Sequence, residues 1–211
     1  MDQPKIVEDY LESGSFLDIY DEEDFYLNNK NLSNELIEDQ TIRHPILETT
    51  VLDHMTFTEC DFNKADFTDV IFKNCNLSNC ILDEASIYRV QFINCKLIGT
   101  NFDDSFLNNV TFKNCLLDMS MMNRLNLKEV EFLDNSMKDV SFNENKMKKT
   151  KFENCNLDKM TLLATPMKGI DLSSCNFETI DLEQDLLRGL KVNDEQAAFL
   201  ARYFLGITVK Y

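Results

Sequence analysis

Residues 72–117 read FKNCNLSNCILDEASIYRVQFINCKLIGTNFDDSFLNNVTFKNCLL, and a large apolar residue stands at every fifth position. The same spacing runs from Leu32 to Val192, and all 33 positions of this series are apolar in a chain that is 44% hydrophobic. A second series, two residues earlier in each pentad, holds mostly small or branched residues, and all seven cysteines lie in it. A period of five fits neither an α-helix nor a long strand, so it predicts short extended pieces separated by corners.

A longer period is superimposed on the pentads. The pattern Phe-x-Asn-Cys-x-Leu begins at Phe72, Phe92, Phe112 and Phe152, which indicates a repeat of 20 residues, or four pentads. If successive coils lie about 4.8 Å apart, residues 20 apart stack in columns, as they do between paired strands. Columns of phenylalanine, cysteine and asparagine follow, the last at Asn74, Asn94, Asn114 and Asn154. The sequence thus predicts an all-β solenoid with four sides and about eight coils, roughly 40 Å long.

The two ends of the chain lie outside the regular pattern. We expect residues 1–30 to form an acidic cap over the first coil, residues 31–192 the β-helix, and residues 193–211 a capping and dimerisation element. The pentads from Leu32 to Leu47 carry Lys30, Glu35 and Gln40 in the small-residue position, which predicts an irregular coil there.

The C-terminal segment has the signals of a short helix. Asn193 and Gln196 have the spacing of an N-cap and its reciprocating partner, Gly206 ends the helix, and residues 207–209 are expected to form a short strand. Ala197, Leu200, Ala201 and Phe204 form the stripe expected to cover the last coil. Apolar residues at this end predict a two-fold dimer interface: Phe199, Leu200, Tyr203, Phe204, Leu205 and Ile207.

The pentads resemble those of the pentapeptide repeat proteins. The resemblance covers about three quarters of the chain and implies a right-handed quadrilateral β-helix (four pentapeptides per coil) with a C-terminal capping helix. Leucine-rich repeats, which also repeat at about twenty residues, lack a strict period of five.

The C-terminal end is similar to that of the loop-free quinolone-resistance (Qnr-type) members from Gram-positive bacteria, in the segments 187–192, 195–198 and 205–207. This resemblance implies a rod shaped like B-DNA that dimerises through this end and binds DNA gyrase and topoisomerase IV.

The outward positions divide the charges between two faces of the predicted rod. The formal charge of the chain is −16, and residues 1–40 contribute 12 acidic against two basic side chains. The face that contains Leu82 (the Leu82 face) has a net charge of −6, with Lys64 and Arg124 set against eight acids. The face that contains Ile87 (the Ile87 face) has a net charge of +4. The acids of the Leu82 face are the candidate partner-binding residues: Asp61, Asp83, Glu84, Asp103, Asp104, Glu144, Asp181 and Glu183.

No combination of residues predicts catalysis, a metal site or a cofactor. His44 and His54 are isolated, and no nucleophile with a matching base or glycine-rich phosphate loop is found. The cysteines share the inward position, which favours reduced thiols that fill space in a cytoplasmic protein. The N-terminus lacks a signal-peptide core and no apolar run is long enough to span a membrane.

We therefore expect a non-enzymatic DNA mimic that binds DNA gyrase or topoisomerase IV and protects it from fluoroquinolones. The alternative is a scaffold or interaction module for an unrelated protein partner. Direct nucleic-acid binding is not expected of so acidic a chain, and the basic run at residues 146–151 is interpreted as a solvated face or as the complement of an acidic patch on a partner.

Overall fold

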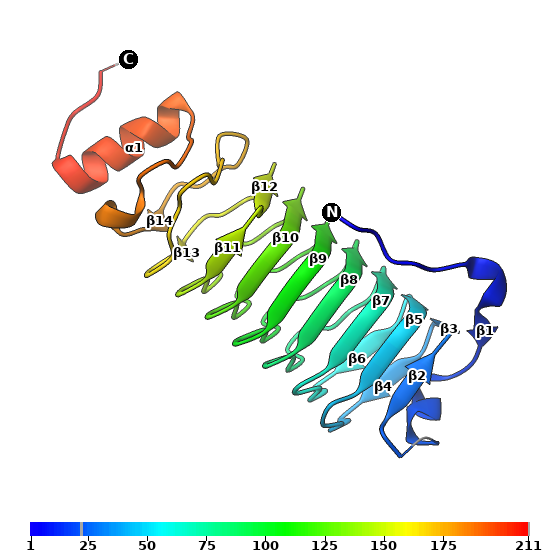
Figure 1. Cartoon of the computed structure of the whole chain (residues 1–211). Coiled ribbons are helices and arrows are strands. Elements are labelled where there is room, and N and C mark those ends of the chain that lie inside the picture. The colour runs from blue at the N-terminus through cyan, green and yellow to red at the C-terminus, as the bar shows by residue number, and fades with distance from the viewer. Residues whose placement is uncertain (22, 211) are drawn as a thin grey trace.

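The computed structural model describes residues 1–21 and 23–210, which form a parallel β-helix followed by one α-helix (Figure 1). All strand pairings in the described residues are parallel, and from Tyr26 onward the partners lie 20 residues apart. The prediction of a four-sided β-solenoid is therefore confirmed. The longest strands, one per coil, are β5 (Ile46–Asp53), β7 (Asp66–Lys73), β8 (Ser86–Ile93), β9 (Phe106–Lys113) and β10 (Asn126–Leu133).

The other elements are short and lie toward the two ends or on the remaining sides. At the N-terminal end they are η1 (Glu8–Tyr10), β1 (Glu12–Ser13), η2 (Phe16–Tyr20), β2 (Tyr26–Asn28), β3 (Lys30–Ser33), β4 (Leu36–Glu38) and β6 (Thr56–Thr58). At the C-terminal end they are β11 (Lys146–Lys148), β12 (Lys151–Glu153), β13 (Met160–Thr161), β14 (Ile180–Asp181), η3 (Gln184–Leu186) and α1 (Asp194–Leu205).

Each coil has four faces, and a residue with positive φ turns the chain at the corners. Each eight-residue strand crosses two faces, and its bend falls on one such residue, for example Arg89 in β8 with a φ of 51°. This left-handed conformation costs most residues some free energy, and asparagine and aspartate bear it best. Asn74, Asn94 and Asn114 occupy one corner column, and their side-chain amides bond in series at 3.2 and 3.3 Å. The predicted asparagine ladder thus supports one edge of the rod.

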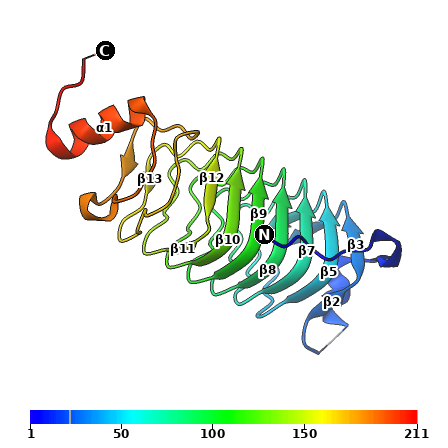
Figure 2. The ribbon, with the colours of Figure 1, turned by 45° about the horizontal axis from the view of Figure 1, so that its top comes forward.

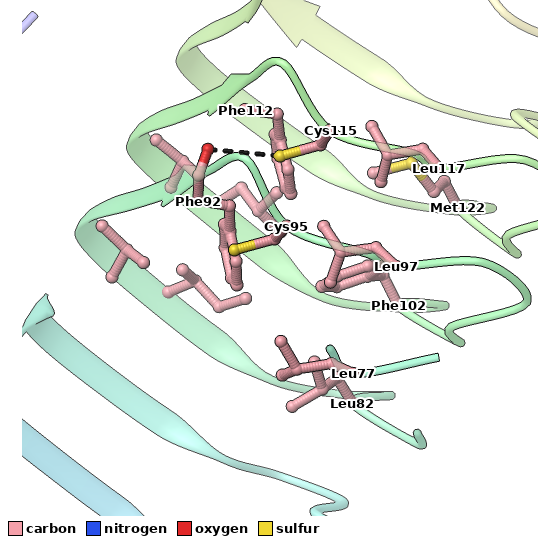
Figure 3. Close-up of a cluster of buried hydrophobic side chains, with 14 of the residues drawn as sticks. Leu77, Leu82, Phe92, Cys95, Leu97, Phe102, Phe112, Cys115, Leu117 and Met122 are labelled. Atoms are coloured by element: carbon pink, nitrogen blue, oxygen red, sulfur yellow. Dashed lines mark hydrogen bonds between the residues drawn. The ribbon is translucent and has the colours of Figure 1, made fainter. Parts of the chain in front are cut away.

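The large apolar series fills the shaft. The rings of Phe72, Phe92, Phe112, Phe132 and Phe152 stack face to face, with 4.9–5.1 Å between successive centroids. Phe102 meets Phe92 and Phe112 edge-on from the opposite side, where Figure 3 shows Leu82 and Met122 at the equivalent positions of the neighbouring coils. Because stacked coils place identical side chains at inter-strand distance, one rotamer satisfies the whole column.

The cysteines lie beside this column as free, buried thiols. The Sγ of Cys115 donates to the carbonyl oxygen of Phe92 at 3.3 Å (Figure 3). The Sγ of Cys95 donates to the carbonyl oxygen of Phe72 in the same way, at 3.4 Å. The hydrogen bond with Cys115 and burial raise the pKa of Cys95 to about 12. These thiols pack as small apolar groups, as their shared inward position predicted.

The early pentads are regular, so the expected irregular coil between Leu32 and Leu47 is wrong. The strands β3 and β4 pair in register with β5 and β6. The reason lies at Glu35, whose carboxylate occupies the small-residue position and accepts bonds from the Ser15 hydroxyl and the Phe16 amide. Phe16 is buried and its ring lies 5.0 Å from that of Phe57, so η2 caps the open end of the core.

Residues 1–5, by contrast, lie along the outside of the rod. They cross β7, β8 and β9 at the bends in the middle of these strands (Figures 1 and 2). The backbone N–H of Lys5 donates to Asp69 at 2.8 Å, and the N–H of Asp2 donates to Asn109 at 2.7 Å. Asp69 and Asn109 stand in one corner column, two coils apart. Pro4, which has no N–H, lies between the two donors in the sequence. We call residues 1–5 the strap.

The helix α1 caps the C-terminal end as predicted. Asn193 and Gln196 form the reciprocal capping box, and Gly206 ends the helix in the left-handed conformation. The side chain of Gln196 also donates to the carbonyl oxygens of Leu172 and Cys175, which attaches the helix to the last coil. The expected strand at residues 207–209 is wrong, because those residues have no strand partner in the described chain.

Candidate functional site

The Leu82 face is built from residues that follow one another at intervals of 20. Parallel bridges join Asp61, Ile81, Asn101, Met121, Ser141 and Thr161 in sequence along it. On this face Glu84, Asp104, Glu144, Asp181 and Glu183 are exposed, while Asp61, Asp83 and Asp103 are half-buried. All eight predicted acids therefore reach one side of the rod.

Arg124 compensates two of these acids. Its guanidinium donates to Asp104 at 2.7 and 2.8 Å and to Asp103 at 3.1 Å. This contact holds the pKa of Asp104 below its usual range. The Lys64 ammonium likewise forms an ion pair with the Glu84 carboxylate, at 3.4 Å. Asp103, Asp104 and Glu84 are thus ion-paired in the free protein by the same two cations that the sequence count set against the acids of this face.

The other five acids have no cation within ion-pair distance among the described residues: Asp61, Asp83, Glu144, Asp181 and Glu183. Asp83 accepts from the Asn63 amide at 2.9 Å, and Glu183 accepts from the Ala164 backbone N–H at 2.8 Å. These neutral donors hold the carboxylates in place and leave their charge available to a partner.

The Ile87 face is divided into two parts. In its N-terminal part, Arg89 makes a two-pronged ion pair with Asp69 at 2.6 Å and stacks over the ring of Tyr88. The side chains of Asp69 and Arg89 are 8% and 11% exposed, because the strap covers that corner. The C-terminal part carries exposed lysines, of which Lys149 bonds to Glu129 at 2.6 Å.

The C-terminal end separates the predicted dimer residues into two groups. Phe199, Leu200 and Phe204 are half-buried and pack against the last coil, and the Phe199 ring meets that of Phe177 at 5.6 Å. Tyr203, Leu205 and Ile207 are 53%, 61% and 47% exposed. The expected inward stripe was partly wrong: Ala197 is exposed and Phe199 turns inward, because Gln196 and Ala198 occupy the buried side of the helix.

Sequence reasoning missed two features of this surface. The strap leaves no periodic signal, and only the Asp69–Arg89 pair at a corner marks the place where it docks. The second feature is a set of exposed apolar residues on one coil, Leu116, Met119 and Met121, at 41%, 60% and 42% exposure. Their outward positions in the pentads could have revealed them.

The described residues contain no group of three or more histidine, cysteine, aspartate or glutamate side chains placed to hold a metal ion. None of the helices within residues 1–21 and 23–210 combines the length and the apolar character needed to cross a bilayer.

Comparison with known proteins agrees with this geometry. A family model described as "Pentapeptide repeat region" matches residues 85–162, and one described as "Pentapeptide repeats (8 copies)" matches residues 46–84 and 60–97. Together they cover more than half of the chain. No curated protein gave a significant sequence match.

Among solved structures, a trypsin-treated variant of QnrB1, described as a plasmid-mediated fluoroquinolone resistance protein, is 18% identical and superposes with a TM-score of 0.58. That match covers 94% of this chain and 96% of QnrB1. HetL, described as a pentapeptide repeat protein involved in heterocyst differentiation regulation in the cyanobacterium Nostoc sp. strain PCC 7120, is 15% identical with a TM-score of 0.33. The HetL match covers 79% of this chain and 86% of HetL. At these identities the likeness establishes the fold alone.

Proposed function

This chain belongs to the pentapeptide repeat proteins, and from that premise we propose that it acts by binding, without chemistry of its own, at the DNA site of a type II topoisomerase. DNA gyrase and topoisomerase IV are the candidate partners, and relief of fluoroquinolone poisoning is the proposed consequence. The resemblance of the C-terminal end to quinolone-resistance members supports this assignment.

The observation that carries the proposal is the row of uncompensated carboxylates on the Leu82 face. They stand on an uninterrupted rod in which the phenylalanine rings of successive coils stack 4.9–5.1 Å apart. Duplex DNA has one charge per about 1.7 Å, or about three over one such coil. The Leu82 face offers about one net charge per coil, so the rod reproduces the shape of a duplex more closely than its charge density. A basic DNA-binding surface can accept such a ligand when the shape fits.

The proposed dimer lengthens this ligand. A two-fold contact through α1 would bury Tyr203, Leu205 and Ile207 and join two rods end to end. The hydroxyl of Tyr203 lies 3.4 Å from Asp181, so the acidic face runs up to the helix that would form the interface. A single partner could then meet the acidic faces of both protomers.

A supercoiling and DNA-cleavage assay with a fluoroquinolone tests the proposal. We expect micromolar protein to reduce drug-induced cleavage or to inhibit supercoiling. The triple variant Asp61→Asn, Glu144→Gln, Asp181→Asn should lose most of this effect, since it neutralises unpaired acids of the Leu82 face. The matched control, Glu38→Gln, Glu59→Gln, Glu178→Gln, removes three exposed charges elsewhere and should retain it. Absence of any effect of the parent protein on either enzyme would refute the proposal.

The alternative is a scaffold for an unrelated protein partner, and the exposed Leu116, Met119 and Met121 favour it. A DNA mimic has no need of an apolar ridge, whereas protein interfaces commonly centre on one. This alternative would be selected by two results together. The tagged protein would capture neither topoisomerase, and it would capture a different protein that the Met119→Glu variant no longer binds.

A further inference from the structure

The most basic surface of this acidic chain lies on the C-terminal part of the Ile87 face. Lys128, Lys148, Lys168 and Arg188 follow one another at intervals of 20 residues, one on each of four successive coils, and all four are exposed. Lys128 pairs directly with Lys148 in the strand register, and Lys168 packs beside Gly189 of the next coil. We call these four residues the basic ladder.

The cations of the ladder are not compensated within the molecule. No carboxylate among the described residues lies within ion-pair distance of any of them, although the chain has 37 acids against 21 bases. The nearest acid of the face, Glu129, already binds Lys149. Like charges stacked on adjacent coils repel one another, so the arrangement is favourable only when an anionic group lies across it.

A hollow with an apolar floor adjoins the ladder. Met147, Ala164 and Pro166 line it together with Lys146 and Lys168, and Glu144 and Asn145 complete its edge. Pro166 explains the opening. On the preceding coils the residue at this position donates its backbone N–H to the coil before it, as Lys146 does to the carbonyl oxygen of Leu125 at 2.9 Å. Proline has no N–H to donate. Among residues 1–21 and 23–210, no strand therefore follows β11 in its sheet, and Met147 is only half-buried where the equivalent Leu127 is fully buried.

We propose that the basic ladder and this hollow form a docking site for an acidic segment of a protein partner, one that also carries an apolar side chain. The ladder binds a row of carboxylates, and the apolar side chain fills the hollow over Met147. Carboxylates on adjacent turns of a helix lie about 5–6 Å apart, close to the spacing of the coils. The apolar floor and the net charge of −16 both favour a protein over a nucleic acid. This site meets the Leu82 face at Glu144, but its cations and its apolar floor lie on the Ile87 side of that corner, so it goes beyond the proposed function and does not depend on it.

Fluorescence anisotropy with the full-length protein tests this site. The probe is a short labelled peptide of glutamates with one central leucine, titrated at low and at raised salt. We expect saturable binding that weakens with salt. The variant Lys128→Gln, Lys148→Gln, Lys168→Gln should bind about tenfold more weakly, as expected from the loss of three surface ion pairs.

The matched control is Lys96→Gln, Lys113→Gln, Lys138→Gln, which removes the same charge from exposed lysines elsewhere and should bind within about twofold of the parent. Replacement of the leucine of the probe by serine should also weaken binding. Equal binding by the ladder and control variants, or no binding to the parent, would overturn the proposal. If a duplex oligonucleotide bound more tightly than the peptide, and the ladder variant lost that binding, the site would instead be a nucleic-acid site.

Discussion

The ring of Phe112 lies 4.9 Å from that of Phe92 and 5.1 Å from that of Phe132, with interplanar angles of 4° in both pairs. Both faces of the Phe112 ring are therefore covered by identical rings, and the side chain is fully buried. We expect Phe112→Asp to prevent stable stacking, because it places an unpaired charge in the shaft. Phe112→Ala should lower the free energy of unfolding by about 3–5 kcal/mol. The control Lys113→Asp changes an exposed neighbour and should melt near the parent; a parent-like melting temperature for Phe112→Asp would contradict the inward assignment.

Acid should release the strap. Burial alone would raise the pKa of Asp69, but the bonds from Arg89 and from the Lys5 N–H outweigh it and hold the pKa below its ordinary value. A lowered pKa stabilises the folded state above the ordinary carboxyl range, near pH 4, and this stabilisation is lost as the pH falls through the folded-state pKa. The protection of the amides of residues 2, 3 and 5, measured as their exchange rate relative to that of an unfolded peptide at the same pH, should therefore fall below about pH 4.

Asp69→Asn should release the strap already at neutral pH. It should also cost about 3 kcal/mol, since it leaves Arg89 nearly buried without its partner. Asp66→Asn, on the same strand but outside any ion pair of the described chain, serves as the control. Unchanged exchange of residues 2–5 in the Asp69 variant would show that the strap is held by other contacts.

Gln196 joins the helix to the shaft. Its side chain closes the capping box and donates to two carbonyl oxygens of the last coil at 2.9 and 2.8 Å. We expect Gln196→Ala to lower the free energy of unfolding by about 2 kcal/mol through loss of the buried hydrogen bonds, whereas Glu195→Ala, an exposed change one residue earlier, should have little effect. Chemical denaturation followed by circular dichroism measures both.

The exposed end of the helix is expected to control the oligomeric state. Sedimentation of the parent should give a dimer, and Tyr203→Glu combined with Leu205→Glu should give a folded monomer. Arg202→Glu alters an exposed residue on the same helix turn and should leave the dimer intact. A parent that sediments as a monomer would remove the dimer from the proposed function.

The seven thiols should be inert in the native protein. All are free and buried, with at most 4% of any of these residues exposed, so a reagent in solution cannot reach the sulfur atoms. A chromogenic thiol reagent should therefore react with none of them before unfolding and with all of them in denaturant. Rapid reaction of even one thiol in the native state would show that the shaft opens locally.

The sequence predicted those parts of the molecule in which residues 20 positions apart have the same structural role. The inward series from Phe57 to Phe142, the stacking of Phe72 on Phe92 and the asparagine ladder from Asn74 to Asn114 all depend on the 20-residue register, and all three were confirmed. Prediction failed where a residue finds a partner outside that register. Glu35 fits the small-residue position only because η2, which lies outside the pentads, supplies the backbone N–H of Phe16 as a donor.

The helix α1 was also predicted only in part. The capping box is a local signal and was found, whereas the side of the helix that faces the core depends on how the last coil ends. The strap could not be predicted, because its bonds join residues 64 and 107 positions apart and no periodicity connects them.

These two long-range bonds also set an order of assembly. Most contacts of the shaft join neighbouring coils and can propagate from one to the next, as in other linear arrays. The corner column that binds residues 1–5 does not exist until the coils containing Asp69, Arg89 and Asn109 are stacked. Closing the long loop between the strap and these coils is slow relative to the addition of one coil to its neighbour. We therefore expect the strap to bind last during folding and to detach first during unfolding. A bound strap then indicates that three consecutive coils have formed.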